Sequence, residues 1–493
     1  MPTDTEKTNG YFLTTRSVQI SRMSRLSKYS VVIALVLSVC LSLCENRAFA
    51  QEKGAAVTPE MLERLAQLEN QTAALRQQLA QLQGASAETP AKTETPAEST
   101  SAVSVSKKDI ETIIEQKIQE SAWKKGDGWF RPYGMFWASL LGADHRFMPN
   151  DAVQRVLPGE AYDESVCTVT ARRSRFGAEV FTPALTLPGV CCPLQMSGRV
   201  EIDFMGELGT AENKPAVLLR HAYWKAENAQ CGFLVGQTDD VVSPLTPGAL
   251  NYYNMWFAGN IGYRNPQVRF SRYFYPGQRT RMEAVAALCQ ISGSDFSAYD
   301  QTSGYPTVQA RLGWTVWRCD PSKAPIQFGI SGHIGEQKYA FGGDAYAITT
   351  WSANADVKIP LTQRFGIQAE FFHGQGLAGF GGGIDQSFDY AIGGFGSRKS
   401  IHSTGGWAEC WFDATCKTRF TVGAGIDDPL DSDMEAAAIR QNTAIYANVV
   451  YRFTSYLQTG FEYSYWKTLY AEGNPGGARA SASVVEWMWQ FTF

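Results

Sequence analysis

The 493-residue sequence has little charge and few histidines: 19% of its residues are Asp, Glu, Lys or Arg, and five are His. Average soluble domains are about one quarter charged. The net charge of -4 shows no basic excess, so no nucleic-acid partner is expected. The mean hydropathy of -0.22 is too low for a bundle of membrane helices, each of which needs about 20 apolar residues.

Motifs for metal ions and catalysis are also missing. There is no CxxC pair, and the histidines show neither HExxH nor another close metal-ligand spacing. Gly374, Gly376 and Gly379 spell GxGxxG, but they lead into a glycine-rich stretch instead of a phosphate-binding helix. We therefore expect no catalytic residue, no metal ion and no cofactor, and the protein is predicted not to be an enzyme.

The first 50 residues have the organisation of a secretory signal peptide. A basic segment at 22–28 precedes an apolar stretch at 31–43, and Ala-Phe-Ala at 48–50 supplies small residues for cleavage. A retained membrane anchor is the alternative, which the short apolar core disfavours. Cleavage removes six basic and three acidic residues and lowers the net charge to -7. It leaves eight cysteines, an even number that permits disulfides without assigning them.

Three further segments precede the strand pattern. Apolar residues recur at alternating spacings of four and three across 61–82, so residues 51–84 are predicted to form a coiled-coil stalk. A lone amphipathic helix lying on another surface is the alternative for this segment. Residues 85–105 are rich in Ala, Thr, Glu, Ser and Pro and are predicted to be a disordered linker. Four isoleucines share one side of a short periplasmic helix within 106–130.

Residues 131–493 have the period of two that is typical of strands, and 12% of the whole chain is aromatic. The C-terminal segment shows the pattern most clearly, with one face formed by Val485, Trp487, Trp489, Phe491 and Phe493. Such a strand would be a poor edge in a soluble sheet, whereas in a closed barrel its aromatic face meets lipid. The terminal Phe also resembles the outer-membrane insertion signal of bacterial β-barrels.

The number and length of these segments favour a membrane barrel. About sixteen of them follow one another, and most reach the roughly 9–11 residues that a tilted transmembrane strand needs. A soluble sandwich would alternate too, but the signal peptide, terminal Phe and strand length favour the membrane. We predict an all-β fold: a transmembrane antiparallel β-barrel of about 16 strands, preceded by a signal peptide and a short periplasmic coiled-coil helix. Short turns and long loops alternate, as they do in outer-membrane barrels.

Four short stretches within the first six strands carry a resemblance to a known family. They are ARRSRFG at 171–177, LRHAY at 219–223, GQT at 236–238 and NPQVR at 265–269. With the signal peptide, coiled coil, linker and barrel, the chain resembles the DcaP-like family of trimeric outer-membrane porins over roughly residues 60–493. The resemblance implies a homotrimer for passive uptake of small, often anionic, solutes. The eight cysteines and the long turn at 182–195 depart from the family pattern.

The selectivity of such a pore would come from charges on its inner wall. With the polar faces inward, the predicted pore-lining residues on strands are Arg173, Arg175, Arg199, Glu201, Asp203, Arg220, Arg269 and Arg311. Asp239 and Asp240 open the loop 239–262, where general porins fold a segment into the pore. The arginines occupy half of the wall, so a mild anion preference is expected. The alternative for each arginine is an ion pair with a lumenal neighbour: Glu201, Asp203, Glu370 or Glu409.

The sequence thus predicts an outer-membrane porin for small hydrophilic solutes. Its expected partners are further copies of itself in a homotrimer and outer-membrane lipid, with the stalk in the periplasm near peptidoglycan. The alternative is a structural protein that tethers the cell envelope through the coiled coil. His221 alternates outward with Leu219 and Tyr223 in this scheme, so it is expected at a subunit interface. Candidate disulfides are Cys410–Cys416 and Cys231 with Cys191 or Cys192.

Overall fold

The computed structural model describes residues 123–125, 127–149, 151–187, 192–206, 215–291, 304–319, 323–341, 344–388, 400–434 and 438–493. The predicted signal peptide, coiled-coil stalk, linker and isoleucine helix lie outside these residues. Strand β2 begins at Gly128, inside the segment 106–130. Within the described ranges, no helix is long and apolar enough to cross a membrane.

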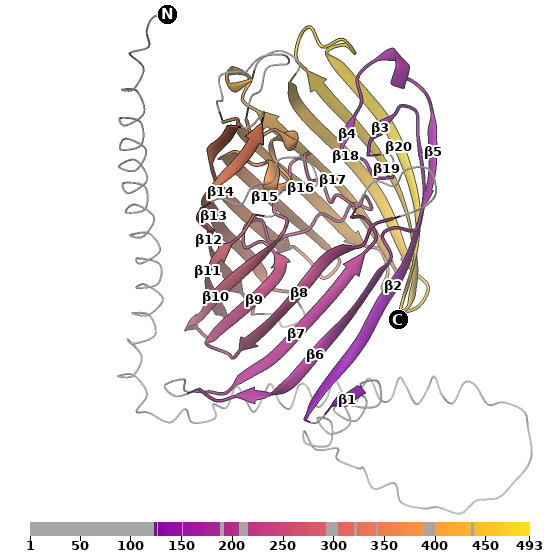
Figure 1. The fold of residues 1–493 in the computed structure, drawn as a ribbon. Helices are drawn as coiled ribbons and strands as arrows, with labels where there is room; N and C mark the ends of the chain where they lie inside the picture. Colours follow the sequence, from indigo (N-terminus) through magenta and orange to yellow (C-terminus); the bar gives the residue numbers. More distant parts are fainter. Residues whose placement is uncertain are drawn as a thin grey trace, which may run out of the picture. The chain divides into compact units, whose positions relative to one another are not determined.

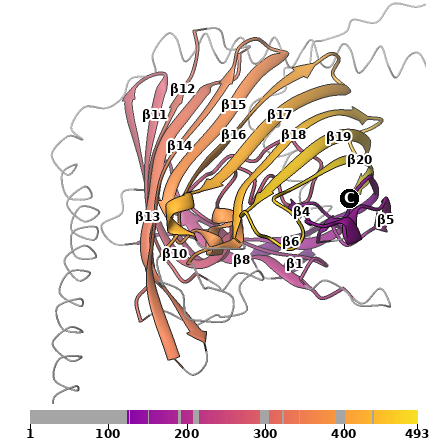
Figure 2. The same ribbon diagram turned by 90° about the horizontal axis from the view of Figure 1, so that it is seen from above.

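Sixteen long strands form one closed antiparallel sheet in the described part of the chain (Figures 1 and 2). They are β2 (Gly128–Ala143), β6 (Arg175–Leu185), β7 (Leu194–Asp203), β8 (Leu218–Glu227), β9 (Cys231–Asp239), β10 (Arg264–Gly277), β11 (Thr280–Cys289), β12 (Thr307–Val316), β13 (Ile326–Phe341), β14 (Asp344–Pro360), β15 (Phe365–Gln375), β16 (His402–Asp413), β17 (Thr418–Pro429), β18 (Ile439–Arg452), β19 (Leu457–Tyr470) and β20 (Arg479–Thr492). Two shorter strands, β1 (Trp123–Lys125) and β5 (Val166–Thr170), pair with β2 and complete the 18-stranded sheet. Successive strands pair, and β2 pairs with β20, which confirms the predicted all-β barrel.

Strand alternation gives the barrel wall two unlike faces. In β17, the side chains of Phe420, Val422 and Ile426 are exposed on the outside, whereas Thr421 and Asp427 are buried on the inside. The same alternation runs through β20, where aromatic side chains face outward. An apolar outer face and a polar inner face are typical of barrels that span a membrane.

The connections at the two ends of the barrel differ in length. At one end, which we call the short-turn end, most connections are short, among them 228–230, 361–364, 414–417 and 453–456. The opposite, long-loop end carries the extended connections 144–174, 240–263 and 376–401. The C-terminus lies at the short-turn end (Figure 1). This alternation agrees with the pattern predicted from the sequence.

Parts of three long loops fold into the barrel (Figure 2). Their short elements are β3 (Phe147–Met148), β4 (Arg155–Val156) and η1 (Glu160–Tyr162) in the first loop, and η2 (Ala378–Phe380) and η3 (Gly383–Asp385) in the loop after β15. A further short helix, η4 (Asp431–Asp433), follows β17. Apolar side chains of the three long loops meet Met205, which follows β7, in a buried cluster; the loop residues are Ala152, Tyr252, Tyr253, Trp256, Phe257 and Ile384. Part of the hydrophobic core therefore lies inside the barrel and is built from loops.

Two irregularities redirect side chains of the first strands into the lumen. Between β5 and β6, the four residues 171–174 lie opposite only three residues of β2. Between β7 and β8, Glu201 pairs with His221 and Ile202 pairs with Leu219, so Arg220 is an extra residue. An extra residue in a bulge shifts the alternation by one position.

The second bulge overturns the prediction that His221 faces outward at a subunit interface. His221 and its neighbour Arg220 are both buried inside the barrel, and His221 Nδ1 lies 3.1 Å from Thr238 Oγ1. Tyr223 pairs with Arg199 and shares its lumenal face, so its outward direction was also predicted wrongly. The alternation is interrupted at Arg220, and the sequence beyond that point continues in the opposite phase.

The candidate disulfide Cys410–Cys416 is not formed, because both residues are free thiols. Cys410 is paired with Val422 within the sheet, while Cys416 lies in the turn that follows β16. Cys192 is also a free thiol, which excludes its bond to Cys231. Cys191 lies outside the described residues.

Gly236 provides a test of the packing between β8 and β9. Its φ is +128°, and a Cβ atom there would lie 2.1 Å from the carbonyl oxygen of Ala222. We expect Gly236→Ala to lower the free energy of unfolding by at least about 2 kcal/mol, because backbone strain and a steric clash add together. Urea-induced unfolding in lipid vesicles measures the loss. Gly277→Ala is the control, since no described atom lies within 4 Å of a Cβ there; equal losses would contradict the expectation.

Candidate functional site

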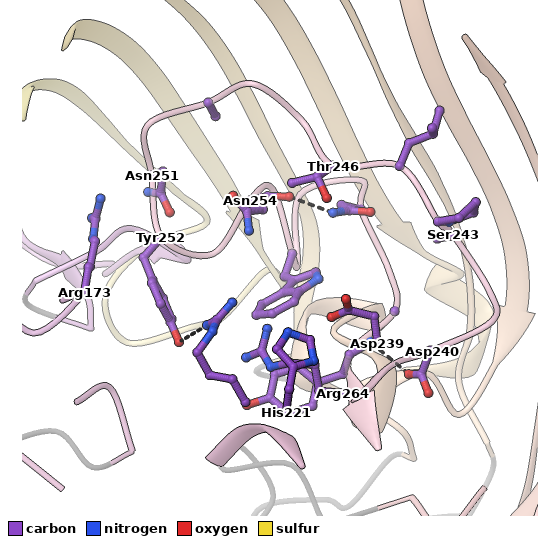
Figure 3. Close-up of a pocket in the computed structure, with 18 of the residues that line it drawn as sticks. Arg173, His221, Asp239, Asp240, Ser243, Thr246, Asn251, Tyr252, Asn254 and Arg264 are labelled. Carbon is purple, nitrogen blue, oxygen red and sulfur yellow. Dashed lines mark hydrogen bonds between the residues drawn. The ribbon is translucent and has the colours of Figure 1, made fainter. Parts of the chain in front are cut away.

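The connection between β9 and β10, residues 240–263, crosses the inside of the barrel in front of the far wall (Figure 3). We call it the crossing segment. Three of its backbone N–H groups donate to carboxylates of β15, β16 and β19: Leu245 to Glu370 at 2.7 Å, Gly248 to Glu409 at 2.6 Å and Leu250 to Glu462 at 2.7 Å. Each of these hydrogen bonds satisfies a backbone N–H group inside the barrel. They hold the crossing segment against the wall opposite β8 and β9.

Carbonyl oxygens of the crossing segment are held as well. Asn448 Nδ2 donates to the carbonyl of Gly248 at 2.8 Å, and Asn442 Nδ2 donates to that of Phe257 at 2.8 Å. From the near wall, Arg173 donates to the carbonyl of Leu250 at 2.7 Å. The crossing segment is thus tied to both sides of the lumen, so its path is defined by side chains of the wall.

A cavity of about 500 Å³ lies between the crossing segment and the wall that includes β2, β6, β7 and β8 (Figure 3). Of the residues predicted to line a pore, those that line this cavity are Arg173, Arg175, Arg199, Glu201, Arg220, Asp239 and Asp240. Asp203, Arg269 and Arg311 do not line it. Among the lining side chains that the sequence did not single out for a pore are Tyr252, Trp256 and Arg264.

Most of the predicted arginines have an acidic partner. The buried guanidinium of Arg220 lies 2.7 Å from both Glu201 Oε1 and Asp203 Oδ2. The other pairs are Arg173–Glu486 at 2.6 Å, Arg199–Glu179 at 2.7 Å and Arg311–Asp356 at 2.6 Å. An ion pair thus describes the geometry of all four arginines, and their charges are largely offset within the wall. Only Arg220 pairs with acids that were predicted as partners, since Glu179, Asp356 and Glu486 were not among them.

Arg175 and Arg264 differ from these four, because no ion pair joins either of them to an acid in the described residues. Arg264 is 5% exposed, and its guanidinium lies 5.5 Å from the ring centre of Trp256 and 4.8 Å from that of Tyr263. Its Nε and Nη2 atoms lack hydrogen-bond partners, as does Nε of Arg175. These two side chains leave positive charge available to the cavity.

One feature of the sequence could have pointed to Arg264 as a lining residue of the cavity. Arg264 directly precedes the NPQVR stretch that carries the family resemblance. It is the first residue of β10, where a loop becomes a strand and alternation does not yet define a direction. Its role in the cavity depends on Trp256 and Tyr263 of the crossing segment, which only the fold brings against it.

Asp239, Asp240 and Arg269 lie at the base of the crossing segment. Asp239 is exposed to the cavity, and its carbonyl accepts a hydrogen bond from Arg269. Asp240 is buried and accepts hydrogen bonds from the backbone N–H of Tyr263 at 2.8 Å and from Gln309 Nε2 at 2.7 Å. The Asp240 carboxyl therefore joins the two ends of the crossing segment to β12.

Burial raises the pKa of the Asp240 carboxyl from 3.8 to about 6, although its hydrogen-bond donors oppose the shift. The folded state then binds this proton more tightly than the unfolded state. The corresponding stability is present below about pH 4 and is lost as the pH rises toward about 6. We expect Asp240→Asn to flatten this part of the dependence of unfolding free energy on pH. The exposed Asp163→Asn is the control; an unchanged slope in Asp240→Asn would contradict the assignment.

No protein-family model and no curated protein matches the sequence. Among solved structures, the outer membrane channel DcaP of Acinetobacter baumannii aligns with a TM-score of 0.60 and 17% identity, over 75% of this chain and 99% of that chain. Salmonella typhi OmpF aligns with a TM-score of 0.47 and 10% identity, over 75% of this chain and 100% of that chain. Pseudomonas putida OprB aligns with a TM-score of 0.45 and 11% identity, over 77% and 96%. The chain thus has the barrel fold of the outer membrane channel DcaP, as its sequence resemblance to DcaP-like porins predicted.

Proposed function

We propose that the protein is an outer-membrane porin through which small hydrophilic solutes diffuse passively. The observation that carries the proposal is the polar lumen of a closed barrel, narrowed by the crossing segment to a cavity lined by arginines. A barrel of about sixteen strands is wide enough to retain an aqueous channel. The fold shared with DcaP, an outer membrane channel, supports the same function.

The proposal includes a mild preference for anions. Five arginines line the cavity, together with the acids Glu201, Asp239 and Asp240. Charges in a narrow lumen act on a permeating ion over short distances, so a small excess of positive charge affects selectivity. The ten residues predicted from the sequence remain the proposed pore lining. Among the arginines that line the cavity, Arg175 and Arg264 carry charge that no ion pair offsets in the described structure.

A homotrimer is part of the same proposal, as the resemblance to trimeric porins implies. The exposed aromatic and aliphatic side chains of the outer face suit contact with lipid and with neighbouring copies. In this arrangement the short-turn end faces the periplasm, and the stalk predicted at 51–84 extends into it.

Planar-bilayer recording tests the porin function directly. The mature protein should produce stepwise current increases in groups of three without an energy source, because each copy carries its own lumen. Removal of residues 51–121, which leaves β1 and the barrel in place, should preserve the steps. Folded protein, identified by its heat-modifiable electrophoretic mobility, that inserts without conducting would refute the porin and favour the envelope tether.

Reversal potentials across a KCl gradient test the anion preference. A unit charge about 5 Å from a permeating ion changes its energy by about 0.8 kcal/mol in water. We therefore expect Arg175→Gln and Arg264→Gln each to lower the chloride-to-potassium permeability ratio by about two- to fourfold. The control is Arg281→Gln on β11, a basic residue outside the cavity whose guanidinium lies over Tyr273. An equal effect of all three substitutions, or no effect, would contradict a selective role for the cavity.

A further inference from the structure

Two basic residues project from the outside of the barrel near the long-loop end. Lys467 of β19 shares the outward face with Phe461 and Tyr463, and Arg479 of β20 shares it with Val485 and Trp487. Lys467 pairs with Ser481, and Arg479 pairs with Leu469. The two basic residues are therefore diagonal neighbours on one face, about 7–8 Å apart in such a sheet.

Hydroxyl groups surround this pair of cations. Tyr465 pairs with Ser483 on the same face, and its phenol interacts electrostatically with both Arg479 and Lys467. Ser481 of β20 pairs with Lys467 and lies two residues from Arg479. We call Tyr465, Lys467, Arg479, Ser481 and Ser483 the outer basic patch. It combines two positive charges with three hydroxyl donors on a surface that otherwise carries apolar side chains toward the short-turn end.

The position of the patch along the strands corresponds to the level of lipid headgroups. Ten residues separate Phe493 from Ser483 on β20. At about 3.3 Å per residue and a tilt of about 45°, they rise about 23 Å. The apolar band of an outer-membrane barrel is about 25 Å tall. Ser483 therefore lies near the outer boundary of this band, and Arg479 lies beyond it.

The two basic residues of the patch form no ion pair within the described structure. No ion pair joins Lys467 or Arg479 to an acid there, whereas Arg440 on neighbouring β18 is paired with Asp431 at 2.7 Å. Asp144, on the loop beside β20, instead accepts the backbone N–H of Ser483 at 2.8 Å. Other strands also carry polar side chains near the long-loop end of their outer face, as Glu336 and Lys338 on β13 and Asp428 on β17 show. The patch on β19 and β20 differs from these, because it brings two basic residues together with no acid on the outer face of either strand.

We infer that the outer basic patch binds the phosphate group of a phosphorylated glycolipid in the outer leaflet. A phosphate monoester carries about -1.5 to -2 charges and three acceptor oxygens, which matches two cations flanked by hydroxyl donors. The aromatic and aliphatic side chains below the patch, including Tyr463 and Trp487, offer a surface for the acyl chains of the same molecule. The inference rests on the proposed outer-membrane location and adds a specific lipid partner to it.

Native mass spectrometry in detergent tests the inference with bisphosphorylated lipid A and with dephosphorylated lipid A as probes. The unsubstituted protein should retain the phosphorylated form, and Lys467→Gln/Arg479→Gln should bind it about tenfold more weakly. Dephosphorylated lipid A should bind both proteins equally and weakly. Lys467→Arg/Arg479→Lys keeps the charges and should retain binding.

The matched control is Arg272→Gln, which removes an outward-facing basic residue of β10 near the short-turn end. It should bind phosphorylated lipid A as the unsubstituted protein does. Equal binding by Lys467→Gln/Arg479→Gln would overturn the inference. Dissociation of that variant into single copies would also overturn it, by assigning the patch to a contact between copies. Bilayer conductance is recorded separately, so failure of the porin function and failure of lipid binding are distinguished.

Discussion

Pairing between the first and last long strands is the interaction on which the rest of the structure depends. β2 and β20 are joined from Met135–Thr492 to Ala143–Val484, and Gly134 exchanges two backbone hydrogen bonds of 3.0 Å with Phe493. The ring of Phe493 packs outside this seam against Phe136, with ring centres 5.3 Å apart. Closure removes the last unpaired edges, so backbone groups of the wall are satisfied without water. The aromatic outer face and the polar interior both follow from this closure.

A closed wall has a second consequence, which concerns the lumenal side chains. Polar groups buried inside must find partners, because an unpaired buried group costs about 1–3 kcal/mol. Here the wall carboxylates of Glu370, Glu409 and Glu462 accept hydrogen bonds from the crossing segment. Arg220, by contrast, is held between Glu201 and Asp203 of the adjacent strand. The need to pair buried polar groups thus explains both the attachment of the crossing segment to one wall and the neutralisation of Arg220 in the opposite wall.

The distribution of charge is more informative for function than its total. The chain has a net charge of -4, yet the cavity contains more arginines than acids. Arg175 and Arg264 contribute to this excess because the fold supplies them with no acidic partner in its described part. On the outer face, Lys467 and Arg479 likewise form no ion pair with an acid in the described residues, and they lie at the level where lipid headgroups are expected. The low charge and high aromatic content of the sequence reflect the large share of wall positions on the apolar outer face.

The sequence by itself determined the number of strands, their approximate ends and the two faces of most of them. These properties depend on neighbours along one strand, and a period of two is visible in any single segment such as 485–493. The period of two could not predict that the His221 side chain faces the lumen, because the bulge at Arg220 is defined by the pairing of β8 with β7. Which arginines are neutralised, and that Arg264 joins the cavity, depended on contacts between residues far apart in the chain. Only the tertiary structure decided these features, because the partners of a lumenal side chain come from other strands and from loops folded into the barrel.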